Sequence, residues 1–266
     1  MGVRTGFAPI DGIQIYYKTI GDGLPVVFIH GFTLDTRMWD DQVEAFAERH
    51  LVVRYDVRGF GRSSPVGTAN YSPLDELKGL LDYLGLPSAM IVGLSMGGGI
   101  ATSFAVAYPN ATRALVAVDS ALWGYRPLDE WIAITGEINR VARNSGPEAA
   151  KALWLANPLF APALENPAVF LRLREIVGDY SGWHWLNENK ERGMNPPTIE
   201  RLTEIRVPSL IVLGERDIPD AHRIADIPVE KIPGARLITL PGSGHMTNME
   251  APRQFNEALL GFLAAI

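Results

Sequence analysis

Three residues of this chain, Ser95, Asp217 and His245, have the types that nucleophilic catalysis requires, and each follows an apolar run. A serine hydroxyl is a weak nucleophile until a base accepts its proton and a third group orients that base. Ser95 stands in Gly93-Leu-Ser-Met-Gly97, between the apolar run 89–92 and helix-forming residues. The pattern predicts a buried strand, a sharp turn that exposes the hydroxyl at the strand tip, and a helix.

The base and the acid are predicted from their positions after later strands. His245 follows a strand predicted at 236–240, and Asp217 follows one at 209–213. Because the C-terminal ends of parallel strands meet at one edge of a sheet, both side chains are expected near Ser95. An alternative role for Asp217 is the N-cap of the next helix, where aspartate is common.

Asp119 is a second candidate for the acid. It ends the strand predicted at 114–118, so it is expected at the same sheet edge, from which it could turn toward a histidine. The residue types alone therefore leave two acids for one base.

The elements that must position these residues alternate along the chain. Such alternation of strands and helices predicts a parallel sheet with right-handed crossovers, and the first strand is expected to form an antiparallel edge. Strands are predicted at 13–19, 25–30, 51–57, 89–92, 114–118, 209–213 and 236–240, and helices at 39–48, 74–84, 96–107, 199–205 and 251–263.

The alternation stops between residues 122 and 197. This stretch has helical patches rich in Trp and Arg that are broken by prolines, and it is too long for an ordinary loop. An insertion that follows a sheet strand lies over the strand ends, where open α/β sheets bind ligands. We therefore expect a helical lid at 122–197, inserted into one α/β core domain made of 1–121 and 198–266.

Composition excludes several classes of function. The net charge is -6 with scattered Lys and Arg, which argues against a nucleic-acid partner, and the absence of Cys excludes disulfides and thiolate chemistry. The five histidines lack the helical spacing of a zinc site, so no metal is expected. No secretory signal or bilayer-spanning run is recognisable, which predicts a cytoplasmic protein without a membrane partner. Homo-oligomer formation stays open.

Five motifs in order resemble the α/β-hydrolase superfamily, in its serine-nucleophile branch. They are His30-Gly31-Phe32, the loop 56–63, Gly93-Leu-Ser-Met-Gly97, Gly214-Glu-Arg-Asp217 and Gly244-His245. The resemblance covers essentially the whole chain. It implies an α/β-hydrolase fold with a mostly parallel sheet, helices on both faces and an inserted helical lid.

The resemblance also implies the roles of the site residues. Ser95 is the nucleophile, His245 the general acid and base, and Asp217 the carboxylate that orients the imidazole. The backbone N–H groups of Phe32 and Met96 form the oxyanion hole. A serine nucleophile argues against the haloalkane dehalogenase and epoxide hydrolase branches, where an aspartate normally holds that position.

The leading functional prediction is a cofactor-free serine carboxylesterase that cleaves small to medium esters through an acyl-enzyme. Alternatives are an enol-lactone hydrolase, because 93–98 resembles 3-oxoadipate enol-lactonases, and a C–C bond hydrolase, whose oxyanion loop is usually richer in Gly and Pro. Thr33 argues against the perhydrolases, which commonly carry proline there. From another class, the chain could be a slow-turnover ligand-binding relative.

Several large side chains are candidates for a substrate pocket, with plain core packing as the alternative. Loop residues are expected to have structural roles: His30 braces the loop behind the nucleophile, and Asp56 and Arg58 form an ion pair. His184 is expected to pack within the lid rather than to line the pocket, and His50 and His222 to be exposed. The pocket candidates are Phe32, Met96, Trp123, Trp154, Trp183 and Met246.

Overall fold

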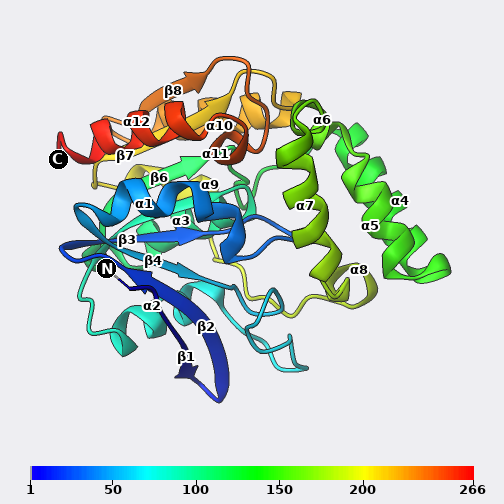
Figure 1. Ribbon diagram of the computed structural model, residues 1–266, viewed down its shortest axis with the longest axis horizontal. Helices are drawn as coiled ribbons and strands as arrows, with labels where there is room; N and C mark the ends of the chain where they lie inside the picture. Colours follow the sequence, from blue (N-terminus) through cyan, green and yellow to red (C-terminus); the bar gives the residue numbers. More distant parts are fainter. Residues whose placement is uncertain (1) are drawn as a thin grey trace.

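The computed structural model describes residues 2–266, which are built around one eight-stranded sheet (Figure 1). The strand order is β1-β2-β4-β3-β5-β6-β7-β8, and every pair from β4 to β8 is parallel. The strands are β1 (Arg4–Ile10), β2 (Ile13–Ile20), β3 (Leu24–Ile29), β4 (His50–Tyr55), β5 (Ala89–Leu94), β6 (Thr112–Val118), β7 (Ser209–Gly214) and β8 (Arg236–Leu240).

Helices cover both faces of the sheet, which confirms the predicted fold class. α1 packs with α11 and α12 on one face, whereas α2, α3, α9 and α10 lie on the other. They are α1 (Asp40–Ala47), α2 (Pro73–Tyr83), α3 (Met96–Ala107), α9 (Thr198–Arg201), α10 (Pro219–Lys231), α11 (Thr247–Glu250) and α12 (Pro252–Leu263), with 3-10 turns η1 (Thr36–Trp39), η2 (Pro109–Ala111) and η4 (Leu202–Glu204).

A helical segment separates β6 from β7 along the chain. Figure 1 shows its helices, in green, beyond the ends toward which the β3 and β4 arrows point. Prolines at the first turns start new helices here, because proline fits there but not inside a helix. We call α4–α8 the helical segment: α4 (Asp129–Ser145), α5 (Pro147–Leu155), η3 (Pro158–Phe160), α6 (Ala161–Leu164), α7 (Pro167–Asp179) and α8 (Trp183–Leu186).

The central strand β5 carries the serine turn at its C-terminal end. All six of its residues are buried, because β3 and β6 flank it and helices cover both faces. Such a strand is apolar on both sides, as the run at 89–92 indicated. The strand is therefore a rigid support for Ser95.

One strand was missed in the sequence. β1 pairs antiparallel with β2 over its whole length, with Ala8 opposite Ile15. Gly6 and Pro9 hide its strand character, because both residues are depleted in strands and Pro is tolerated only at edges. The antiparallel edge predicted at the first strand is thus a pair of strands.

None of the helices within residues 2–266 combines the length and the apolarity that crossing a bilayer requires.

Candidate active site

Ser95 occupies a strained turn between β5 and α3. Its backbone has φ 56° and ψ -118°, a region that non-glycine residues rarely adopt. The turn is held by its own backbone, because the Ser95 N–H donates to the Val118 carbonyl at 2.9 Å and the Ser95 carbonyl accepts from Ala121 at 3.0 Å. These bonds fix the serine at the strand tip with its side chain on the wall of a cavity.

Two glycines allow the turn to be this tight. A Cβ atom at Gly93 would lie 2.0 Å from the Gly97 carbonyl oxygen, and one at Gly97 would lie 2.2 Å from the Ile29 carbonyl oxygen. Both clashes are with backbone atoms, which cannot move aside as a flexible side chain could. The small residues around Ser95 are therefore a steric requirement of the strand-helix crossing.

Asp217 and His245 form a buried pair at the ends of β7 and β8. His245 Nδ1 lies 2.8 Å from Asp217 Oδ2, and the two side chains are 8% and 0% exposed. The other carboxylate oxygen of Asp217 accepts the backbone N–H of Ile218 at 2.7 Å. Asp217 therefore orients the imidazole. The alternative role, the N-cap of the next helix, is wrong, because Ile218 is the N-cap of α10 and no side chain caps that helix end.

The second ring nitrogen of His245 is available for chemistry. His245 Nε2 is buried and has no hydrogen-bond partner among residues 2–266. Ser95 and His245 line the same cavity, although they are 150 residues apart in sequence. A buried polar atom without a partner is costly, so its presence at a cavity wall is typical of a functional position.

Asp119 does not contact His245 and is held by other groups. Its Oδ1 accepts the Gly214 N–H at 2.7 Å and its Oδ2 accepts the Thr247 hydroxyl at 2.7 Å. Burial raises the pKa of Asp119 well above its usual value, and the charge of Asp217 adds to the effect. Of the two acids that the sequence left open, the structure brings Asp217 to the histidine.

The two backbone donors predicted for an oxyanion lie on neighbouring elements. Met96 begins α3, where the first N–H groups of a helix have no intrahelical acceptor. Within residues 2–266, no backbone carbonyl accepts the N–H of Phe32 or of Met96. Both residues line the cavity beside Ser95, as an oxyanion hole at this position would require.

Thr33 fixes the loop that carries Phe32, a role the sequence did not indicate. Its φ is 65°, unusual for a β-branched residue, and it is 1% exposed. The Thr33 hydroxyl donates to the Phe32 carbonyl at 2.6 Å and accepts from the Trp154 indole N–H at 2.8 Å. A hydrogen bond from the helical segment thus supports the loop of the candidate oxyanion donor.

His30 braces the same loop from behind, as predicted. Its Nδ1–H donates to the Gly31 carbonyl at 2.8 Å, and its Nε2 accepts the Val57 N–H at 2.9 Å. Burial lowers the pKa of His30, which keeps the ring neutral as this pattern of one donor and one acceptor requires.

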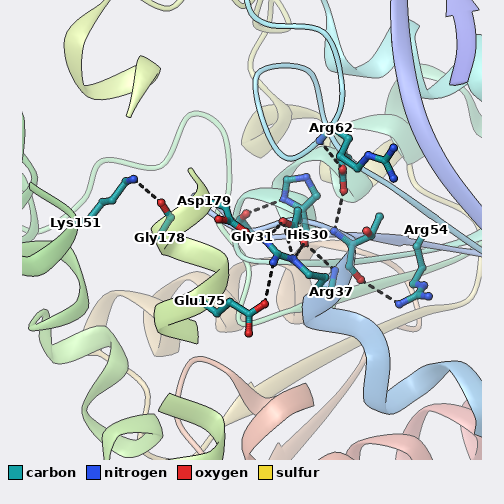
Figure 2. Close-up of polar contacts among 12 residues, drawn as sticks. His30, Gly31, Arg37, Arg54, Arg62, Lys151, Glu175, Gly178 and Asp179 are labelled. Carbon is teal, nitrogen blue, oxygen red and sulfur yellow. Dashed lines mark hydrogen bonds and ion pairs between the residues drawn. The ribbon is translucent and has the colours of Figure 1, made fainter. Parts of the chain in front are cut away.

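Ion pairs attach the helical segment to the core next to this loop (Figure 2). Arg37 of η1 binds Asp179 at 2.8 Å and Glu175 at 3.3 Å, both on α7. Asp35 of the core holds the same guanidinium at 2.7 Å. Arg37 therefore joins α7 to the loop that contains Phe32.

The predicted ion pair between Asp56 and Arg58 is not formed. Asp56 accepts the backbone N–H groups of Thr36 and Arg62, both at 2.8 Å, whereas Arg58 pairs with Glu76 of α2 at 3.3 Å. The sequence could not show this because the partner of Arg58 lies on a helix that only the fold brings next to the loop. Asp56 remains structural, as a cap for backbone donors.

A cavity of 470 Å³ opens in front of Ser95, with walls from the core and the helical segment. Its lining is mainly apolar and aromatic, which is typical of small-molecule sites. Four of the predicted pocket residues, Phe32, Met96, Trp123 and Trp154, lie on this wall. The wall also includes residues that the sequence did not indicate: Tyr125, Trp131, Thr135, Ile138, Asn139, Leu159, Trp185, Asn189, Ile218, Asp220 and Ile224.

Two residues predicted to line the cavity, Trp183 and Met246, lie elsewhere. Met246 is 1% exposed and packed in the core, since the chain turns inward after His245. In the single turn of α8, Trp185 is the buried tryptophan at 3% exposure and faces the cavity, so Trp183 points away.

Three histidines lie in places that differ from expectation. His184 lines the cavity, and its ring also stacks on Phe60 with centroids 4.6 Å apart. Burial lowers the pKa of His184 to about 4. His50 and His222 are half-buried rather than exposed.

The chain is similar to known hydrolases over nearly its whole length. A family model described as "Alpha/beta hydrolase family" matches residues 26–258. The "Putative carbamate hydrolase RutD" of Azorhizobium caulinodans is 30% identical over 95% of this chain and 96% of its own. The "3-oxoadipate enol-lactonase 2" of Acinetobacter baylyi is 25% identical over 93% of this chain and 92% of its own.

A solved structure shows the same architecture. The structure described as "Est816 as an N-Acyl homoserine lactone degrading enzyme" superimposes with a TM-score of 0.74 at 26% identity. The match covers 97% of this chain and 100% of that one, so the helical segment and the sheet are both included.

Proposed function

The chain belongs to the alpha/beta-hydrolase family, and on that premise we propose that it is a serine hydrolase that cleaves carboxylic esters of small to medium size through an acyl-enzyme. The observation that carries this proposal is the buried Asp217–His245 pair, because its histidine has an Nε2 without a hydrogen-bond partner in residues 2–266 and lines the same cavity as Ser95. A serine, a base and an orienting acid are the three parts that acyl transfer to a hydroxyl requires.

In the first half-reaction, Ser95 Oγ attacks the ester carbonyl carbon and His245 Nε2 takes the hydroxyl proton. Asp217 holds the Nδ1–H tautomer and stabilises the imidazolium that forms. His245 then gives the proton to the leaving alcohol as the C–O bond breaks, which leaves the acyl group on Ser95. In the second half-reaction the same histidine activates water, and the acid is released.

The negative charge of the tetrahedral intermediate falls on the former carbonyl oxygen. We assign its binding to the N–H groups of Phe32 and Met96, because neither donates to a backbone carbonyl within residues 2–266 and both residues line the cavity beside the serine. Removing one such donor typically costs about 3–4 kcal/mol of transition-state stabilisation. The position of the Phe32 loop therefore matters as much as that of the catalytic side chains.

The similar proteins support attack at an acyl carbonyl carbon. Their names include a carbamate hydrolase, an enol-lactonase and a lactone-degrading enzyme, and carbamates and lactones share the acyl C–O bond of esters. A lactone, which is an internal ester, is accordingly the second candidate substrate. The mechanism needs no change for it, since the leaving alkoxide stays attached to the acyl chain.

The test is labelling and turnover on purified protein. A fluorophosphonate should label the protein stoichiometrically, and short p-nitrophenyl esters should be hydrolysed catalytically. Ser95→Ala should lose both properties and keep the fold, whereas Ser145→Ala, at the exposed end of α4, should keep both. Labelling without turnover would indicate a slow ligand-binding relative instead of an enzyme.

A further inference from the structure

Away from the reacting atoms, the part of the cavity wall that the structure describes carries an acidic side chain and no cationic one. Besides the phenol of Tyr125, four ionisable side chains line it: Asp119 and His245 at the strand ends, His184, whose lowered pKa keeps it neutral, and Asp220. No Lys or Arg from residues 2–266 lines this cavity. A substrate that enters it therefore meets a carboxylate but no cation.

Asp220, at the first turn of α10, is the carboxylate in question. It is 5% exposed, and its oxygens accept the Tyr125 hydroxyl at 2.8 Å and the Leu128 backbone N–H at 3.0 Å. These donors are neutral, and no cation lies within ion-pair distance of Asp220 in the described chain. Within residues 2–266, neutral donors therefore satisfy this carboxylate and no ion pair does.

The wall around Asp220 is aromatic. Tyr125, which binds it, and Trp131 both line the cavity, together with Trp123 and Trp154. The negative faces of aromatic rings attract cations and repel anions. The nearest basic residue on the same helix, Arg223, is exposed and acts on the Tyr125 hydroxyl from outside the cavity lining.

From these observations we propose that the cavity selects esters whose remaining groups are uncharged or cationic and rejects esters that carry a carboxylate. Transfer of a carboxylate out of water is costly unless a cation pairs with it, and no Lys or Arg of residues 2–266 lines this wall. This inference rests on the proposed ester hydrolysis and names the charge class of its substrate. It also sets the chain apart from any hydrolase of a lactone that carries a free carboxylate, such as an oxoadipate enol-lactone.

Two pairs of isosteric p-nitrophenyl esters test the charge alone. The glutarate half-ester is matched by the neutral 5-methylhexanoate, and the 4-(trimethylammonio)butanoate by the neutral 5,5-dimethylhexanoate. We expect kcat/KM for the glutarate to fall about 10- to 100-fold below that of its neutral isostere. The cationic ester should stay within about threefold of its isostere, or exceed it.

Variants of two aspartates on α10 test whether Asp220 causes the lower activity on the glutarate ester. Asp220→Asn should narrow the gap between glutarate and 5-methylhexanoate by about three- to tenfold, because it removes the facing charge. Asp226→Asn, an exposed position on the same helix, should leave the gap unchanged. The gap is the ratio of kcat/KM for the two esters within one variant, so a general loss of activity does not affect it.

A basic side chain introduced into the cavity wall should increase activity on the carboxylate ester. Asn139 of α4 is half-buried and lines the cavity, so Asn139→Arg should raise activity on the glutarate ester relative to Asn139→Gln. Equal wild-type activity on the glutarate and its neutral isostere would overturn the proposal. Failure on all four esters would instead contradict the ester hydrolysis on which it rests.

Discussion

The indole N–H of Trp154, on α5, donates a 2.8 Å hydrogen bond to Oγ1 of Thr33 in the loop that carries Phe32. The same hydroxyl donates to the Phe32 carbonyl at 2.6 Å, and the Phe32 and Trp154 rings meet edge to face at 5.8 Å. Trp154, 121 positions away in sequence, therefore holds a loop in which Thr33 has a left-handed backbone conformation. The helical segment is part of the support of the candidate oxyanion hole.

Removal of this hydrogen bond should slow the chemical step. Trp154→Phe keeps the aromatic packing but loses the donor, so we expect kcat to fall about 10- to 100-fold with little change in KM, because small displacements of catalytic groups cost this much. Trp183→Phe, outside the cavity wall, is the matched control and should change neither constant. An effect on KM alone would show that Trp154 contacts substrate without positioning the loop.

Replacement of the two candidate acids should separate catalysis from structure. Asp217→Asn should lower kcat by about 10³–10⁴-fold, because an amide cannot hold the imidazole in the tautomer that accepts the serine proton. Asp119→Asn leaves the Asp217–His245 bond intact, so its main effect is expected on stability. Steady-state kinetics and thermal unfolding of both variants check this. An unchanged kcat in Asp217→Asn would assign the acid's role to Asp119.

The serine turn should tolerate no added methyl group. Gly93→Ala would place Cβ 2.0 Å from the Gly97 carbonyl oxygen, so we expect a loss of about 3 kcal/mol or more in the free energy of unfolding. Gly136→Ala is the control, since nothing lies within 4 Å of its Cβ and it is inside α4. That variant should be neutral or more stable by up to about 1 kcal/mol. Similar denaturation midpoints for both would contradict the steric argument.

Glu76 should make stability depend on pH. Burial raises its pKa from 4.5 to about 7 despite Arg58 at 3.3 Å, so the folded state binds a proton more tightly than the unfolded chain does. Its contribution to stability is therefore present below pH about 4.5 and is lost as pH rises toward 7.

Glu76→Gln removes this titration, so its stability relative to wild type should increase between pH 5 and pH 8, by up to about 3 kcal/mol. Urea denaturation at both pH values measures the difference. Glu230→Gln, an exposed position on α10, should show no such increase. A constant difference between wild type and Glu76→Gln across this range would show that Glu76 titrates near its ordinary pKa.

The sequence was sufficient to predict those site residues that directly follow the C-terminal end of a strand. Ser95, Asp217 and His245 could be placed together because each follows a buried strand, and parallel strands end at one edge. Asp119 satisfied the same rule, and only the fold showed that Gly214 and Thr247 occupy its oxygens.

The cavity wall could be predicted only in part. Which face of a short helix meets the core depends on tertiary packing, so α8 gave no signal to prefer Trp185 over Trp183. Nothing in the sequence singles out Asp220, because its hydrogen-bond partners Tyr125 and Leu128 are more than 90 residues away. The partner of Arg58 was likewise set by a distant helix.

The covalent intermediate tests the central claim most directly. Wild-type protein should be mixed with a slowly deacylating p-nitrophenyl ester, quenched in acid within the first turnover and digested for mass spectrometry. We expect one acyl group per chain, on Ser95 within the peptide that contains Gly93 to Gly97, and a burst of p-nitrophenol of the same size. Full turnover with no acylated serine, or with the acyl group on another residue, would contradict this account.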